Sequence, residues 1–156
     1  MKNQTCCFTG HRTIPAGRYA DLAGRLRKEI AGLIQQGVTV FKTGGALGFD
    51  TLAAQLVLEA RDKYPQIKLV LILPCRDQTS GWRRADKERY EEIKNACDQY
   101  SYLSDGYTRD CMFQRDRRLV EDSRVCVCYL GKKTGGTAYT VRYARQKGLT
   151  VINLFP

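Results

Sequence analysis

The stretch VTVFKTGGALGFD, residues 38–50, joins an apolar, strand-like segment to a helix-like segment through a glycine-rich turn. A second turn of this kind, GKKTGGT at 131–137, follows the apolar segment VCVCY at 125–129. Because glycine has no Cβ, such turns can bring bare backbone N–H groups against a ligand. The helix that follows each turn adds unpaired N–H groups and the positive end of its dipole. Each turn therefore predicts an anion site, and two of them indicate a nucleotide-like ligand.

Strand-like and helix-like segments alternate along the chain. The predicted strands are 4–9, 39–42, 68–73, 101–103, 124–129 and 150–153, and the predicted helices are 17–36, 47–63, 83–96, 109–121 and 137–147. The segment LVLIL at 69–73 is apolar on both faces, which is typical of a buried parallel strand. The pattern predicts the α/β class, with a single doubly wound, mostly parallel, Rossmann-like sheet that has helices on both faces. We expect one domain that spans residues 1–156.

Most of the unusual residues fall in the connections that lead from a strand to the next helix. In a parallel sheet these connections share the carboxyl edge, where open α/β sheets bind their ligands. We therefore predict that ligand-binding residues gather at this edge. They are Thr9, Gly10, His11, Arg12, Gly44, Gly45, Ala46, Gly48, Asp50, Pro74, Arg115, Asp116, Gly135, Gly136 and Thr137.

Three of these residues allow more than one interpretation. Asp50 either complements the dipole of its helix or accepts hydrogen bonds from ribose hydroxyls. His11, the one histidine of the chain, is either structural or, as a neutral imidazole, hydrogen-bonds a ribose or a base. Arg12 beside it can bind a phosphate through two parallel N–H···O hydrogen bonds.

A charged pair interrupts the apolar stripe of the predicted helix 109–121. Arg115 and Asp116 are spaced at helical intervals from Met112, Leu119 and Val120, so both belong to the buried side of that helix. Buried charges are costly unless they are paired or face a ligand. The two residues are therefore either an internal ion pair or a pair that faces the cleft, and we favour the cleft.

Composition limits the partners that we expect. The net charge is +10, which favours an anionic partner, either a small nucleotide-like phosphate ligand or nucleic acid. Since no apolar run reaches the roughly 18–20 residues of a membrane span, and the N-terminus has no signal-peptide pattern, we expect no membrane partner and a cytoplasmic location. We also expect a homo-oligomer. The seven cysteines form no Cys-x-x-Cys, so we predict buried, reduced thiols and no metal site.

The motifs TGHR at 9–12, GGALGFD at 44–50 and GGT at 135–137 occur in a characteristic order, together with Pro74-Cys75, Gln78, Trp82, Arg115 and Ser123. This order resembles the YpsA-like branch of the SLOG superfamily, which joins the DprA/Smf proteins to the LOG proteins. The resemblance implies a Rossmann-like fold that binds nucleotides or nucleotide-derived molecules at the glycine turns. It also implies a role as a ligand sensor or binding protein. We expect no further cofactor. Trp82 is either a packing anchor or a stacking platform for a base.

Comparison with the motifs of the LOG and DprA families leaves two alternative functions. LOG phosphoribohydrolases carry a catalytic glutamate three residues after the threonine of their Gly-Thr motif, and that position is Thr140 here. We therefore assign no catalytic residue. One alternative is a nucleoside monophosphate hydrolase in which Asp50 or Asp116 replaces that glutamate. Another is a single-stranded DNA-binding module, because residues 43–50 resemble the DprA pattern Ser-Gly-x-Ala-x-Gly-Ile-Asp.

Overall fold

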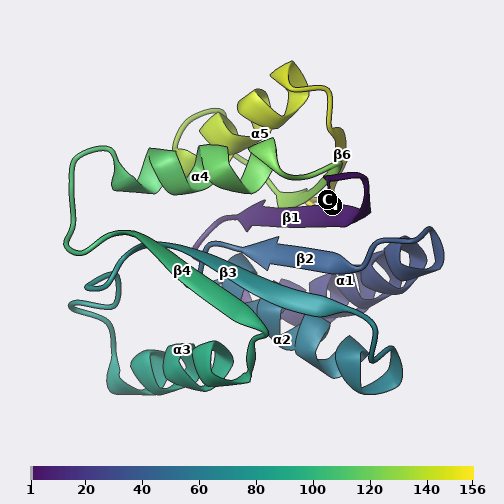
Figure 1. Ribbon diagram of the computed structural model, residues 1–156, viewed down its shortest axis with the longest axis horizontal. Coiled ribbons are helices and arrows are strands. Elements are labelled where there is room, and N and C mark those ends of the chain that lie inside the picture. The colour runs from purple at the N-terminus through teal and green to yellow at the C-terminus, as the bar shows by residue number, and fades with distance from the viewer. Residues whose placement is uncertain (1) are drawn as a thin grey trace.

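A computed structural model describes residues 2–156 of the protein as a six-stranded parallel sheet with helices on both faces (Figure 1). The strands are β1 (Thr5–Gly10), β2 (Val40–Thr43), β3 (Lys68–Cys75), β4 (Gln99–Ser104), β5 (Val125–Tyr129) and β6 (Thr150–Asn153). The α-helices are α1 (Ala16–Gln35), α2 (Phe49–Lys63), α3 (Arg84–Ala96), α4 (Cys111–Glu121) and α5 (Gly136–Gln146), and a 3-10 turn spans Lys2–Gln4. The predicted fold class and every predicted element are confirmed, with small shifts at the ends.

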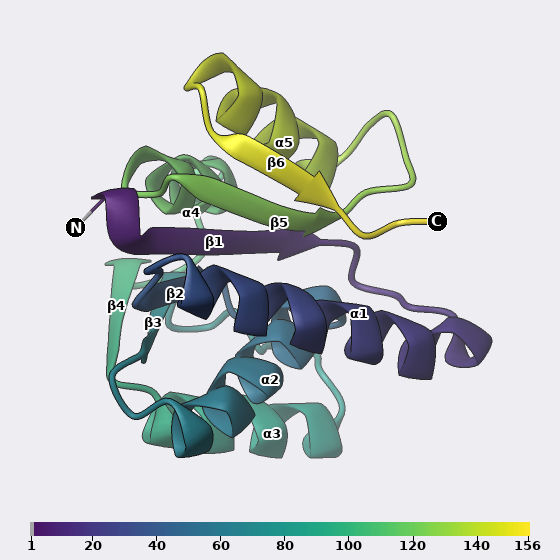
Figure 2. The same ribbon diagram turned by 90° about the vertical axis from the view of Figure 1, so that its right-hand side faces the viewer.

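The order of the strands across the sheet is β4-β3-β2-β1-β5-β6, and each neighbouring pair is parallel. Helices α1, α2 and α3 cover one face, and α4 and α5 cover the other (Figures 1 and 2). The chain moves outward from β1 to β4 and then returns to the other side of β1 with β5. The strand order therefore reverses between β1 and β5, which is where doubly wound sheets bind ligands.

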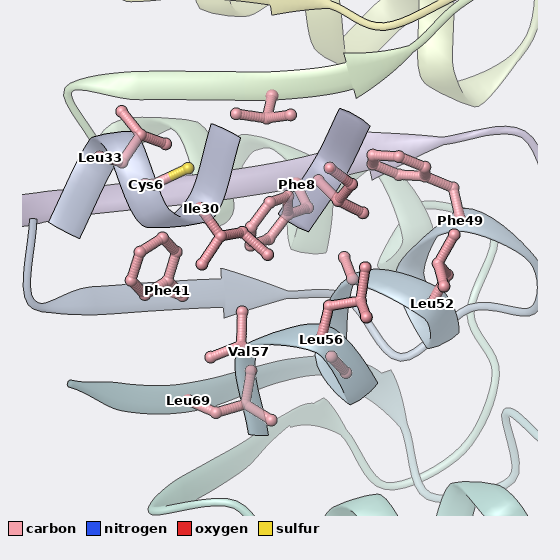
Figure 3. Close-up of a cluster of buried hydrophobic side chains, with 14 of the residues drawn as sticks. Cys6, Phe8, Ile30, Leu33, Phe41, Phe49, Leu52, Leu56, Val57 and Leu69 are labelled. Carbon is pink, nitrogen blue, oxygen red and sulfur yellow. The ribbon is translucent and has the colours of Figure 1, made fainter. Parts of the chain in front are cut away.

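Two apolar clusters hold the layers together. The larger lies between the sheet and α1, α2 and α3, and its aromatic centre is formed by Phe8, Phe41 and Phe49 (Figure 3). Its counterpart under α4 and α5 includes Leu119 and Val141. Since successive side chains of a strand point to opposite faces, the two neighbouring cysteines of β1 enter different clusters. Cys6 belongs to the first and Cys7 to the second.

No helix within residues 2–156 combines the length and the hydropathy needed to cross a membrane. All seven cysteines are free thiols, and six of them are buried.

Candidate ligand-binding cleft

A cleft of about 930 Å³ opens at the carboxyl edge of the sheet, beside the ends of β1 and β5. Its walls come from the segment after β1, the loop between β5 and α5, and the inner side of α4. Eleven of the fifteen predicted residues line it: Thr9, Gly10, His11, Arg12, Ala46, Asp50, Arg115, Asp116, Gly135, Gly136 and Thr137. The structure thus brings most of the predicted set together at the reversal of the strand order.

The other four predicted residues, Gly44, Gly45, Gly48 and Pro74, do not line this cleft. Internal packing accounts for the glycines. A Cβ on Gly44 would lie 2.5 Å from Nη1 of Arg115, and one on Gly45 would lie 2.5 Å from the side chain of Leu73. Gly48 has a φ of 76° and leaves no space for a Cβ against the backbone of Arg12. These glycines let α4, β3 and the segment after β1 approach the first turn closely.

The first glycine turn is already faced by a carboxylate of the protein. The backbone N–H of Ala46 donates a hydrogen bond to Oδ2 of Asp50 at 3.2 Å. The Asp50 side chain lines the cleft, yet the residue is only 5% exposed. Burial raises the pKa of Asp50 to about 6, although the positive charge of Arg115 and the N–H of Ala46 oppose this shift. Asp50 is therefore a buried acid that titrates close to neutral pH.

Arg115 and Asp116 form a buried ion pair that also lines the cleft. Nε of Arg115 donates to Oδ1 of Asp116 at 2.7 Å, and Nη1 donates to the carbonyl of Gly44. Burial raises the pKa of Asp116, and the Arg115 guanidinium beside it partly offsets this effect. Both of the interpretations drawn from the sequence describe the geometry, since the pair is internal and borders the cleft. The carbonyl of Gly44 also accepts a hydrogen bond from Nε2 of Gln78 at 3.2 Å, so the side chains of Arg115 and Gln78 together hold the first glycine turn in place.

The second glycine turn is open to solvent. Gly135 is the N-cap of α5 with a φ of 101°, and both Gly135 and Gly136 are exposed. Asp116 faces this turn, because a Cβ on Gly136 would lie 3.9 Å from its Oδ2. Thr140, which stands at the LOG glutamate position, is fully buried and donates its hydroxyl to the carbonyl of Gly136 at 2.9 Å. Thr140 thus fastens the first turn of α5 and supplies no carboxylate.

His11 connects the two segments at the reversal of the strand order. Its Nε2 accepts a hydrogen bond from the backbone N–H of Gly131 at 2.8 Å, which requires that this nitrogen be unprotonated. Burial, and then the nearby positive charge of Lys132, lower the pKa of His11. The neutral imidazole thus holds the loop between β5 and α5 against the end of β1, and its ring also borders the cleft.

Sequence reasoning missed the aromatic and apolar part of the lining. It consists of Tyr107, Met112, Phe113, Leu119, Tyr129 and Phe155. Tyr129 is the last residue of β5, so the carboxyl-edge rule used for the other residues points to it as well. Phe113 and Phe155 carry no comparable signal. Trp82 does not line the cleft and packs edge-to-face on Tyr90 at 5.6 Å, as expected of a packing anchor.

The end of β6 and the residues after it hold one side of the cleft in place, and Phe155 joins its lining. The side chain of Asn153 makes two hydrogen bonds of 3.1 Å with the backbone of Leu130, one to its N–H and one to its carbonyl. Phe155 then packs against Tyr129, with ring centroids 5.1 Å apart. The base of the loop between β5 and α5 is therefore held from both sides, by His11 and by Asn153.

Within residues 2–156 no three histidine, cysteine, aspartate or glutamate side chains are grouped so that they could hold a metal ion. Three cationic side chains that line the cleft have no ion-pair partner among residues 2–156. They are Arg12, Arg109 and Lys132. The cleft thus combines a buried acidic floor, aromatic side chains and free positive charges.

Three solved structures are similar to this chain. DNA processing protein A (DprA) from Streptococcus pneumoniae matches with a TM-score of 0.69 and 19% identity, over 97% of this chain and 50% of that one. The chain thus spans about half the length of that protein. The Helicobacter pylori DprA is described as having a unique single-stranded DNA binding mode. It matches with a TM-score of 0.69 and 17% identity, over 97% of this chain and 65% of that one. The protein TM1055 matches with a TM-score of 0.62 and 20% identity, over 97% of this chain and 72% of that one. At these identities the likeness shows the fold alone.

Sequence relatives support a narrower grouping. A UPF0398 protein of Bacillus thuringiensis (strain Al Hakam) is 28% identical over 126 residues, which are 79% of this chain and 68% of that protein. A UPF0398 protein of Bacillus cereus (strain AH187) matches to the same extent. The family model described as the YspA SLOG family matches residues 7–151. The chain belongs to the YspA SLOG family, as the order of its motifs predicts.

Proposed function

We propose that this protein binds a nucleotide or a nucleotide-derived ligand in the cleft at the carboxyl edge, and that it acts as a sensor or binding protein. The observation that carries the proposal is the convergence of an open glycine turn, free cations and aromatic side chains at the reversal of the strand order. A flat base is suited to the aromatic lining, and a phosphate is suited to the cations. Membership of the SLOG family supports the same class of ligand.

Gly136→Val tests this proposal. Gly136 has no positive φ, and an added Cβ would meet Asp116 Oδ2 at 3.9 Å, an ordinary contact distance. The variant should therefore fold while its added bulk occupies the cleft. Gly24→Val in α1, where nothing lies within 4 Å of the added Cβ, is the matched control. Gly45→Val is a poor probe, since φ is 74° there and Leu73 is too close.

Calorimetric titration with adenine nucleotides should give binding to the wild type and to the Gly24 variant, and none to a folded Gly136 variant. Equal affinity in all three proteins would exclude the cleft as the site. Native mass spectrometry of protein taken from cells should detect a retained small molecule, which would identify the base and the number of phosphates.

One observation favours a hydrolase as a second candidate. Asp50, in the cleft, has a pKa raised to about 6, and general acids work best when their pKa lies near the operating pH. We nevertheless expect no enzyme-like release of base from AMP, for which typical turnover is about 1–1000 per second. Chromatography over hours measures this release. Turnover that is lost in Asp50→Asn or Asp116→Asn would establish the hydrolase, whereas turnover indifferent to both points to a contaminant.

Single-stranded DNA is the competing ligand. The net charge of +10 and the single-stranded DNA binding mode described for the Helicobacter pylori DprA support it. Binding to DNA through many phosphate contacts would weaken steeply with salt. Titration of a short oligodeoxynucleotide at several salt concentrations therefore belongs beside the nucleotide panel.

A further inference from the structure

Both glycine turns, which the sequence marks as phosphate sites, are faced by carboxylates of the protein itself. Asp50 accepts from the N–H of Ala46 at the first turn. Asp116 directs Oδ2 toward Gly136 at the second. The two residues are 5% and 7% exposed and both border the cleft. A phosphate group seated on either turn would therefore meet a buried negative charge, which disfavours it.

The guanidinium between these carboxylates is not available to a phosphate. Nε of Arg115 is bonded to Asp116, Nη1 to the carbonyl of Gly44, and Nη2 lies 3.8 Å from the sulfur of Met112. Arg115 thus offers no free fork of two N–H groups to a phosphate, which is the geometry that makes arginine a good phosphate ligand. The floor of the cleft presents acceptors, so it is suited to a ligand group that donates hydrogen bonds.

Positive charge lies instead at the rim. Arg12, Arg109 and Lys132 are exposed, line the cleft and have no ion-pair partner in the part of the chain that the structure describes. The exposed rings of Tyr107 and Phe113 belong to the same lining. A nucleotide can match both the acceptors at the floor of the cleft and the cations at its rim only if its phosphate lies outward and its sugar lies inward.

We propose that Asp116, together with Asp50, accepts hydrogen bonds from the 2′- and 3′-hydroxyls of a ribose, and that the phosphate of the same ligand lies among the cations of the rim. The inference rests on the proposed function and narrows its ligand to ribonucleotides. DNA is disfavoured, since its sugar has no 2′-hydroxyl and its 3′-oxygen is esterified within the chain.

Calorimetric titration of the wild type at pH 7.5 with AMP, 2′-deoxy-AMP and 3′-deoxy-AMP tests this orientation without any variant. Loss of one hydroxyl should weaken binding by about 10- to 100-fold, the effect of one hydrogen bond to a charged group. A short oligodeoxynucleotide should not compete with AMP. Equal affinities for the three nucleotides would overturn the ribose assignment and leave the proposed function standing. Failure of all three to bind, together with the absence of any retained nucleotide in native mass spectrometry, would overturn the proposed function, and the ribose assignment with it.

Asp116→Asn sharpens the test. The amide oxygen of asparagine can still accept a hydrogen bond from Nε of Arg115. The amide NH₂ group then faces Gly136, so the variant presents a hydrogen-bond donor where the wild type presents an acceptor. The preference for AMP over its deoxy forms should then shrink toward unity, and inorganic sulfate should bind more tightly than to the wild type. Asp110→Asn is the control, because Asp110 is the N-cap residue of α4, pairs with Arg117 and does not line the cleft. An unchanged ribose preference in Asp116→Asn would exclude Asp116 as the acceptor.

Discussion

Replacement of Asp50 by asparagine should make the protein more stable at neutral pH. Burial raises the pKa of Asp50 from 3.8 to about 6 in the folded protein. Because one pKa unit corresponds to about 1.4 kcal/mol, the ionised carboxylate destabilises the folded state by about 3 kcal/mol at pH 7. Asparagine has nearly the same shape and can still accept from the N–H of Ala46, so the variant removes the buried charge and keeps that hydrogen bond.

The dependence on pH has a definite sign. A folded-state pKa above the unfolded one means that the folded protein binds more protons between pH 3.8 and about 6. The wild type therefore loses free energy of unfolding as pH rises through this window, and the cost is complete above it. The difference between Asp50→Asn and the wild type should be small at pH 4 and approach about 3 kcal/mol at pH 7.

Urea unfolding followed by circular dichroism at pH 4, 5, 6 and 7 measures this difference. Asp21→Asn is the control, because Asp21 is exposed on α1 and its removal should leave the pH profile unchanged. If Asp50→Asn is less stable than the wild type at pH 7, the attraction of Arg115 and the Ala46 hydrogen bond outweigh the burial of the charge. That result would refute the reasoning.

Three further changes have expected outcomes. Arg115→Ala should lower the free energy of unfolding by about 3–5 kcal/mol, as expected when a buried carboxylate loses its partner, and urea unfolding would contradict this if the loss were below about 1 kcal/mol. Protonation of His11 should release the Gly131 N–H. Since burial lowers its pKa, this clamp should be intact above about pH 6.5, the ordinary pKa, and be lost on further acidification; an acid-insensitive Gly131 amide signal in NMR would disprove it. Tyr129→Phe should raise the urea midpoint, because the buried Tyr129 hydroxyl finds no hydrogen-bond partner within residues 2–156; a lower midpoint would argue that the hydroxyl is satisfied by water or ligand.

The fold was predictable because local patterns determine its elements. The apolar run at 69–73 forms the interior of β3, and the helical repeat of Leu22, Leu26 and Ile30 forms the buried side of α1. Alternation of such segments leaves few topologies other than a parallel, doubly wound sheet. The convergence of the residues after β1 and β5 then follows from the topology.

The role of the first glycine turn was not predictable in the same way. The function of Gly44 depends on the approach of Arg115, which is far along the chain and arrives only when α4 packs across the sheet. Sequence spacing carries no information on such a contact. It likewise leaves undecided whether Asp116 faces Arg115, Gly136 or both, and it does not reveal that Phe155 returns to the cleft.

The position of β1 at the centre of the sheet has a consequence for biosynthesis. Cys6 pairs with Phe41 on one side and with Val125 on the other. As the chain leaves the ribosome, β2 follows β1 after a single helix, but β5 follows only after four α-helices and three strands. One hydrogen-bonding edge of β1, and the apolar side chain of Cys7 beside it, thus stay uncovered until β5 has been made, which favours mispairing and the binding of chaperones. The strand β1 is therefore enclosed only after the whole segment from α1 to α4 has been synthesised, and contacts this distant in sequence predict slow folding.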